Sequence, residues 1–393
     1  MYDVPAPEGG IGPVGEVRLI PAWETLRILP YAKGHASVMG DMYTLDGEPS
    51  EICPRNFLKQ MIAEAAECGF QVQAAFENEF SLLKPGRDSK KVEPIDSTIY
   101  AETYAMDTSC EVLLAICDAL TQQGLILEQY YPESASGQHE ISIRHCDAMT
   151  AANEQIIFRE TVKAVAMKHN VVASFLPKIF PNQAGNGTHL HISLHKNDGT
   201  NIVASDTTPG ELSPTASHFI AGILHHLPAL MAITVPSTNS YRRLQPCTWS
   251  GNYRCWGYVN RECAVRVPLN PNKSTLNPSN FELKASDATS NPYLSLGSVI
   301  ASGLDGVRRQ IPIPPPVAVD PGHLSEDELH RMNIEILPRS LKDAIDALSG
   351  NEVLLKALQP QLSKALLGVR MFEYESMKDM SLEEEVELLL QRY

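Results

Sequence analysis

Four segments that lie far apart in the chain share one pattern, in which apolar and polar side chains alternate residue by residue. The clearest is 189–195, where leucine and isoleucine alternate with histidine and serine. Successive side chains of a β-strand point to opposite sides, so a period of two predicts strands with one face on a core and one face away from it. The pattern therefore predicts an antiparallel sheet that contains residues 72–81, 140–144, 189–195 and 281–284.

Longer segments have apolar residues three and four positions apart, which predicts helices. In the first of them the apolar positions are 57, 58, 61, 62 and 65, and Gly69 ends the pattern. The expected helices are 54–68, 109–123, 149–169, 213–235 and 291–309, followed by two or three more, of which the last lies near 381–391. Helices together with the antiparallel sheet predicted above correspond to the α+β class.

The remaining segments have weaker patterns. Residues 239–268 are basic and are expected to be mostly loop, and 311–322 form a proline-rich connector. Residues 1–50 hold turn signals and short β-rich stretches at 15–20 and 36–41, with too few apolar positions for a core of their own. We expect them to lean on one large domain formed by 51–393.

Composition narrows the class of partner. The formal net charge of -15 argues against nucleic acids and anionic membranes, because both attract clustered Lys and Arg. The 8 cysteines include no Cys-x-x-Cys pair, so they predict reduced thiols rather than a zinc knuckle or a disulfide framework. The chain has no apolar leader and no apolar stretch that spans a bilayer, so a cytoplasmic protein is expected.

The polar faces of the predicted strands carry many ionisable groups. A solvated acidic sheet accounts for most of them, but it does not explain the glycine-rich turn directly before His189. Residues 128–140 add three carboxylates, which repel by roughly 4 kcal/mol per pair at about 4 Å unless a positive charge lies between them. The candidate groups are Glu77, Glu79, Glu133, Glu140, Glu282 and His189, with Arg243, Arg261, Arg266 and Lys284 as counter-charges.

Carboxylate oxygens with one imidazole suit Mg²⁺ or Mn²⁺ better than zinc. Clustered cations beside such carboxylates fit phosphoryl transfer, which depends on positioning the phosphate and neutralising its charge. The residues alone therefore favour a metal-dependent enzyme that uses ATP.

Six segments in this order resemble the glutamine synthetase family, from about residue 10 to the C-terminus. They are Phe76–Phe80, Glu133–Glu140, Gly185–Leu194, Asn239–Leu244, Asn260–Pro268 and Glu282–Leu294. The resemblance implies an antiparallel half-barrel backed by helices, with ATP entering at one end and glutamate at the other. It also implies that residues 1–50 are a partial N-terminal β-grasp domain, and a homo-oligomeric ring if that domain is complete. The chain is either a fragment of a longer protein or naturally short at this end.

The resemblance also implies roles for the candidate residues. Two or three Mg²⁺ or Mn²⁺ ions are expected, one held by Glu79, Glu133 and Glu140 and another by Glu77, His189 and Glu282. His191, Arg261 and Arg266 resemble groups that hold phosphate, with the arginines acting in catalysis, while Glu128 and Ser193 fall at nucleotide positions. Gly185 and the catalytic Arg243 fall where the family holds glutamate. The implied reaction passes through γ-glutamyl phosphate, which an amine displaces.

Most departures from the family pattern lie at the substrate and acceptor end, and one lies near the nucleotide. Trp249 stands where ammonia-using members have a flap glutamate, and an indole has no basic group to deprotonate ammonium. Lys284 replaces an arginine that grips the substrate carboxylate, Ala184 an asparagine, and Asn280 an arginine near the nucleotide. We therefore predict an organic amine as acceptor, packed on Trp249. Two alternatives stay open: an ammonia-using glutamine synthetase, and a catalytically silent member kept for structure or regulation.

Overall fold

The computed structural model describes residues 4–85, 92–269 and 276–393. Within them, one sheet of ten strands runs in the order β14-β11-β12-β13-β10-β5-β7-β6, and β8 and β9 also pair with β5. Its strands are β5 (Gln71–Leu83), β6 (Leu127–Pro132), β7 (Gln138–Ile143), β8 (Cys146–Asp147), β9 (Val172–Ser174), β10 (Thr188–His195), β11 (Tyr253–Tyr258), β12 (Cys263–Val267), β13 (Phe281–Leu283) and β14 (Glu335–Ile336). The α+β class is confirmed.

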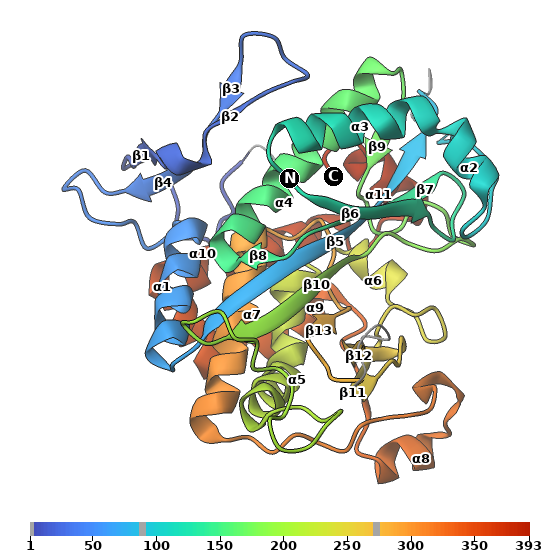
Figure 1. The fold of residues 1–393 in the computed structure, drawn as a ribbon. Helices are drawn as coiled ribbons and strands as arrows, with labels where there is room; N and C mark the ends of the chain where they lie inside the picture. The colour runs from blue at the N-terminus through green and yellow to red at the C-terminus, as the bar shows by residue number, and fades with distance from the viewer. Residues whose placement is uncertain (1–3, 86–91, 270–275) are drawn as a thin grey trace.

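The four alternating segments all form strands of this sheet, namely β5, β7, β10 and β13. In β10 the leucines and the isoleucine are fully buried in the main core, as the alternation predicts. β5 and β10 run antiparallel through the middle of the molecule, with α3 above them and α5 and α7 below them in the view of Figure 1.

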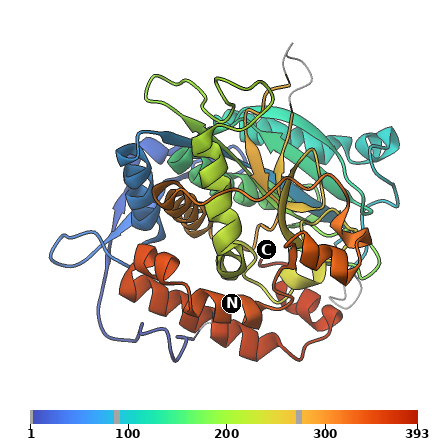
Figure 2. The ribbon, with the colours of Figure 1, turned by 90° about the horizontal axis from the view of Figure 1, so that it is seen from below.

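The helices follow the predicted segments closely. They are α1 (Pro54–Glu67), α2 (Thr103–Thr108), α3 (Cys110–Gln122), α4 (Ala148–Lys168), α5 (Pro214–Thr234), α6 (Ser240–Arg243), α7 (Pro292–Arg309), α8 (Glu326–Arg331), α9 (Leu341–Ser349), α10 (Glu352–Met377) and α11 (Leu382–Leu389). Helices α1, α5, α7, α9 and α10 share one large core with the sheet, and α3 and α4 share a second one. Figure 2 shows the C-terminal helices, in red, as an outer layer.

Helix α5 is long and apolar enough to cross a membrane by composition alone. However, 78% of its most apolar window is buried inside the protein, which is typical of a core helix. Its close neighbour is α7, and Gly222 of α5 lies so near α7 that a Cβ would come 2.2 Å from the carbonyl oxygen of Ser302. The apolar character of α5 therefore reflects packing between helices.

Three details of the sequence prediction were wrong. Residues 239–268 contain two strands, β11 and β12, which pair in parallel, so the sheet is mixed rather than purely antiparallel. Both strands are buried on both faces for most of their length, which removes the alternation that marks a half-buried strand. Four helices, not two or three, follow the connector in the described chain.

Residues 4–50 form two small sheets that project from the body of the molecule (Figure 1). One pairs β1 (Arg18–Pro21) with β4 (Gly40–Tyr43), and the other pairs β2 (Arg27–Ile28) with β3 (Ala36–Ser37); a short 3₁₀ turn, η1 (Trp23–Thr25), lies between them. Among the described residues, this segment contributes no member to the two large cores beyond two partly buried side chains, Tyr31 and Met39. It contacts the larger body, for example through the ion pair of Asp41 with Arg55, while the division of the chain at residue 50 and the relation to a β-grasp domain stay predictions.

Candidate functional site

The register of the sheet places the predicted ionisable residues opposite one another. Glu77 on β5 pairs with His189 on β10, and Glu79 pairs with Glu140 on β7. His191 of β10 pairs with Glu282 of β13. Because side chains at paired positions point to the same side of a sheet, the register gathers these groups on one polar face.

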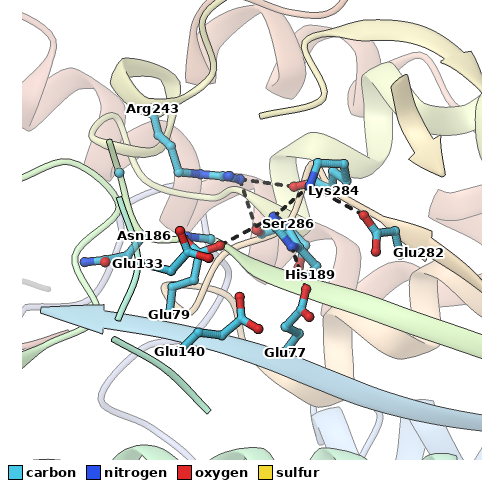
Figure 3. A network of polar contacts seen from close by, with 12 residues as sticks. Glu77, Glu79, Glu133, Glu140, Asn186, His189, Arg243, Glu282, Lys284 and Ser286 are labelled. Carbon is cyan, nitrogen blue, oxygen red and sulfur yellow. Dashed lines mark hydrogen bonds and ion pairs between the residues drawn. The ribbon is translucent and has the colours of Figure 1, made fainter. Parts of the chain in front are cut away.

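This face forms the floor of a cavity of about 1020 Å³. Figure 3 shows the carboxylates of Glu77, Glu79, Glu133 and Glu140 near His189, with Lys284 and Arg243 beyond them. The cavity is lined by all six predicted metal ligands and all four predicted substrate residues, together with Arg261 and Arg266: Glu77, Glu79, Glu133, Glu140, Gly185, His189, Arg243, Trp249, Arg261, Arg266, Glu282 and Lys284.

A second cavity of about 270 Å³ lies on the other side of Glu77, which lines both. It contains the three remaining predicted nucleotide residues, Glu128, His191 and Ser193. Asn280, which departs from the family pattern, also lines it and lies 3.0 Å from His191 Nδ1. Glu128 is paired with Arg144 at 2.6 Å on the rim, so it lies away from the carboxylates of the larger cavity.

The two histidines lie between three of the carboxylates. His189 Nδ1 lies 2.9 Å from Glu77 Oε2, and its Nε2 lies 3.9 Å from Glu79 Oε1. His191 Nε2 lies 3.5 Å from Glu77 Oε2 and 3.2 Å from Glu282 Oε2. Glu77, His191 and Glu282 thus offer three ligand atoms within 4.8 Å of one another. The predicted ligand set for this ion contained His189 in place of His191. Which imidazole serves as the ligand stays a prediction.

Two of the clustered carboxylates, Glu133 and Glu140, have no basic partner among the described residues. In the described chain neither makes an ion pair with Lys or Arg, and Glu140 instead accepts a 2.6 Å hydrogen bond from the Tyr131 hydroxyl. Burial, followed by the charge of Glu79, raises the pKa of Glu133 to about 7. Burial, followed by the charges of Glu77 and Glu79, raises the pKa of Glu140 to about 10. Clustered carboxylates that are shielded from water and repel in this way fit a divalent cation, which would supply the missing counter-charge.

Glu282 has the opposite environment. It is fully buried, and its Oε2 lies 2.6 Å from Arg266 Nη2 while its Oε1 lies 3.4 Å from Lys284 Nζ. Burial opposes its ionisation, but Lys284, His191 and Arg266 together hold the pKa of Glu282 below its usual range. Lys284 Nζ is also 3.4 Å from His189 Nε2, so its ammonium group lies among the predicted metal ligands while the residue lines the larger cavity.

Arg243 is held at the back of the larger cavity by backbone. It is 6% exposed, and its Nη2 donates hydrogen bonds to the carbonyl oxygens of Lys284 and Ser286 at 3.2 and 3.0 Å. Gly185 packs against it so closely that a Cβ at this position would lie 2.7 Å from Arg243 Cγ and 2.2 Å from the carbonyl oxygen of Pro177. The glycine-rich turn therefore allows the arginine and the turn to approach each other.

Trp249 stands on the lip of the same cavity. Its loop follows α6, its backbone is left-handed with φ 56°, and the residue is 56% exposed. The guanidinium of Arg261 lies 5.3 Å from the centre of its ring, and its backbone N–H donates a 2.7 Å hydrogen bond to Glu262 Oε1. The indole is thus presented to the cavity by two neighbouring residues of the turn between β11 and β12.

Sequence reasoning missed several residues that shape the site. Glu262 is 4% exposed and fixes the Trp249 loop, and Gln138 Nε2 donates to Glu79 Oε2 at 3.2 Å and to the Gly185 carbonyl at 3.0 Å. Tyr131 faces Glu140 across β6 and β7. Of these residues, only Tyr131 and Gln138 could have been suspected from the sequence, because both lie within the acidic stretch at 128–140.

Comparisons with known proteins agree with this geometry. Residues 51–389 match the family model for the catalytic domain of glutamine synthetase. Type-1 glutamine synthetase 1 of Dictyostelium discoideum is 34% identical over 394 residues, which cover 96% of this chain and 78% of that protein. Gamma-glutamylpolyamine synthetase GlnA3 of Streptomyces coelicolor is 35% identical over 372 residues, which cover 94% of this chain and 79% of that protein.

The fold is shared as well. A solved structure of GmaS in complex with ADP has a TM-score of 0.86 at 30% identity and covers 97% of this chain and 87% of its own. One assignment to a family accounts for the six ordered sequence segments, for the polar face with its cavity and for the match over residues 51–389. The chain belongs to the glutamine synthetase family and is a ligase that joins glutamate to ammonia or an amine.

Proposed function

We propose that this ligase joins the γ-carboxylate of glutamate to an organic amine rather than to ammonia. The observation that carries the proposal is the placement of Trp249, whose indole lines the lip of the larger cavity and is held there by Arg261 and Glu262. An exposed indole offers an apolar surface for a carbon chain and no base for an ammonium ion. The relative named a gamma-glutamylpolyamine synthetase supports an amine acceptor, although relatives named glutamine synthetases are equally similar.

The two cavities suggest a division of substrates. ATP would enter the smaller cavity, with Glu128, Ser193 and His191 as its contacts, and glutamate and the amine would enter the larger one. Glu77 borders both, so the γ-phosphate and the γ-carboxylate would meet near it. Attack by the carboxylate oxygen on the γ-phosphorus forms γ-glutamyl phosphate and releases ADP. Attack by the amine nitrogen on the carbonyl carbon of this acyl phosphate then forms the amide bond and releases phosphate, while the nitrogen loses a proton to solvent.

Family members use divalent metals, and the residues here fit that requirement because the buried Glu140 and the partly buried Glu133 make no ion pair with Lys or Arg in the described chain. We assign Glu79, Glu133 and Glu140 to one Mg²⁺ or Mn²⁺, and Glu77 and Glu282 with His189 or His191 to another. Such ions neutralise phosphate charge when bound.

The cationic residues have separate proposed tasks. Arg261 and Arg266 line the larger cavity and would stabilise the charge that develops on the transferred phosphoryl group. Arg243 and Gly185 would hold glutamate at the back of the cavity, since the guanidinium is fixed by backbone carbonyls and is the buried cation nearest the glycine-rich turn.

The proposal is tested by measuring phosphate release with ATP, glutamate and a panel of acceptors, namely ammonium, alkylamines, diamines and polyamines. We expect kcat/KM to be higher for an organic amine than for ammonium. Each methylene group buried on the indole contributes about 0.8 kcal/mol, or about fourfold in kcat/KM. A higher kcat/KM for ammonium than for every organic amine would contradict the proposal.

Variants at Trp249 sharpen this test. Trp249→Ala should lower kcat/KM for the preferred amine by roughly 10- to 60-fold, if two or three methylene groups lose their contact, and should leave ammonium nearly unchanged. Trp249→Glu should shift the preference toward ammonium. Trp23→Ala is the matched control, because Trp23 is 69% exposed on the N-terminal segment. An equal loss with both acceptors in Trp249→Ala would contradict the assigned role.

A silent family member is the second candidate, favoured by Lys284. Its ammonium group lies 3.4 Å from both Glu282 Oε1 and His189 Nε2 and thereby competes with a metal ion for these ligands. Equilibrium binding of Mn²⁺ and ATP separates the two cases. An enzyme binds both, and Lys284→Met should then raise Mn²⁺ affinity, whereas a silent scaffold binds neither.

A further inference from the structure

A second cluster of ligand-type side chains lies beside the Trp249 loop and takes no part in the proposed reaction. Cys247 comes from that loop, and Asp320 and His323 come from the end of the proline-rich connector, where η2 (Pro321–His323) forms a single 3₁₀ turn. One sulfur, one carboxylate oxygen and one imidazole nitrogen all lie within 4.8 Å of one another. Cys247 and Asp320 are 73 positions apart in the sequence, so no short motif such as Cys-x-x-Cys could have predicted this cluster.

The backbone brings the two sides together. Gly322 approaches Cys247 so closely that a Cβ would lie 2.5 Å from the thiol sulfur. Asp320 Oδ1 accepts a 2.7 Å hydrogen bond from the Gly322 N–H, and its other oxygen, Oδ2, lies 3.6 Å from His323 Nδ1. One carboxylate oxygen therefore shapes the turn, and the other stays available as a ligand.

Both arms of the cluster are anchored. Asn260 Nδ2 donates 2.9 Å hydrogen bonds to the carbonyl oxygens of Val317 and Val319, which fixes the connector just before Asp320. On the other side Thr248 Oγ1 donates to the Gln245 carbonyl at 2.7 Å, which closes the turn that carries Cys247. The His323 side chain is 76% exposed and can rotate without unpacking the core.

We propose that Cys247, Asp320 and His323 bind one zinc-class ion. Thiolate and imidazole ligands favour Zn²⁺, in contrast to the carboxylates of the larger cavity, which favour Mg²⁺ or Mn²⁺. Tetrahedral zinc with bonds of about 2.0–2.3 Å places its ligand atoms roughly 3.3–3.8 Å apart, so a small rotation of His323 closes the site. Three protein ligands leave the fourth position open to water.

The ion would join the Trp249 loop to the connector. Trp249 lies two residues after Cys247, and both residues line the larger cavity. Both also have left-handed backbones, with φ 57° and 56°, a conformation that surrounding structure must hold in place. Bound zinc would hold the lip of the cavity in one position and so reduce access to it.

The test uses Co²⁺ as a probe on the full chain, with excess Mg²⁺ to occupy the carboxylate sites. Co²⁺ bound to a thiolate shows a charge-transfer absorption that oxygen ligands do not give, so the signal reports on a cysteine without turnover. We expect one equivalent of this absorption, displaced by Zn²⁺ and lost in Cys247→Ser. Cys110→Ser is the matched control, since Cys110 is the other exposed cysteine among the described residues. No thiolate absorption, or an unchanged signal in Cys247→Ser, overturns the proposal.

A second measurement reports on the histidine. Zn²⁺ should protect Cys247 from alkylation by iodoacetamide, mapped by mass spectrometry. His323→Asn should weaken this protection so that more than about 100-fold higher Zn²⁺ is needed, because a direct ligand matters more than a partner outside the ligand shell. His330→Asn, on α8, is the matched control. Equal protection in both variants would exclude His323 as a ligand.

Discussion

One carboxylate, Asp41 of β4, joins the N-terminal segment to the large domain through two cations, a buried arginine and a half-exposed lysine. Arg55 Nε lies 2.8 Å from Asp41 Oδ1, with side chains 5% and 10% exposed. Lys59 Nζ lies 2.5 Å from Asp41 Oδ2, but the lysine side chain is 45% exposed. The same acceptor therefore allows a direct comparison of a buried and a solvated ion pair.

The expected losses differ severalfold. Arg55→Met removes a buried cation that also donates a 3.2 Å hydrogen bond to Tyr293 Oη and bonds Asn153 Oδ1, so it should cost about 3 kcal/mol of unfolding free energy. Lys59→Met removes a half-exposed partner that water screens, so it should cost about 0.5 kcal/mol. Salt at 1 M should weaken only the lysine pair.

The assay is urea unfolding followed by far-UV circular dichroism, with unfolding rates compared where refolding is incomplete. Limited proteolysis gives a second readout, since cleavage within 1–50 should become faster in Arg55→Met than in Lys59→Met. Equal losses in the two variants, or a loss below about 1 kcal/mol for Arg55→Met, would refute the claim that burial sets the strength of this contact.

Gly185→Ala should raise the KM for glutamate, measured by steady-state kinetics, about tenfold or more, because the new Cβ would lie 2.2 Å from a backbone oxygen. Gly12→Ala is the control, because a Cβ at position 12 would meet no atom within 4 Å. Burial alone would raise the pKa of Asp41, but Lys59 and Arg55 lower it, so the free energy of unfolding that the carboxylate contributes is present above about pH 4 and is lost as pH falls further. Below that pH the free energy of unfolding of Asp41→Asn should therefore change less with pH than that of the unchanged protein. Identical pH dependences of the two proteins would contradict this prediction. Mn²⁺ at 100 times its Kd should stabilise the protein by about 2.7 kcal/mol, which thermal melts can measure. Glu140→Gln should largely remove this stabilisation, and the surface variant Glu111→Gln should retain it.

Local patterns carried much of the fold. The period of two placed β10 and its buried face correctly, and apolar spacing with a glycine stop placed α1 to within one residue at its end. These features depend on neighbours along the chain, so the sequence records them directly. Strands β11 and β12 were missed because most of their residues are buried on both faces and each strand also contains an arginine, so no period of two remains.

The candidate site divides in the same way. The sequence by itself determined which side chains share a face of a strand, such as Glu77 with Glu79, and that the glycine-rich turn must approach something closely. Only the tertiary structure decided the partners: the register that sets Glu77 opposite His189, the three cations around Glu282, and the meeting of Cys247 with His323. Side-chain alternation fixes direction but carries no information on which strand lies alongside or how far it is shifted, and those choices follow from packing of the whole core.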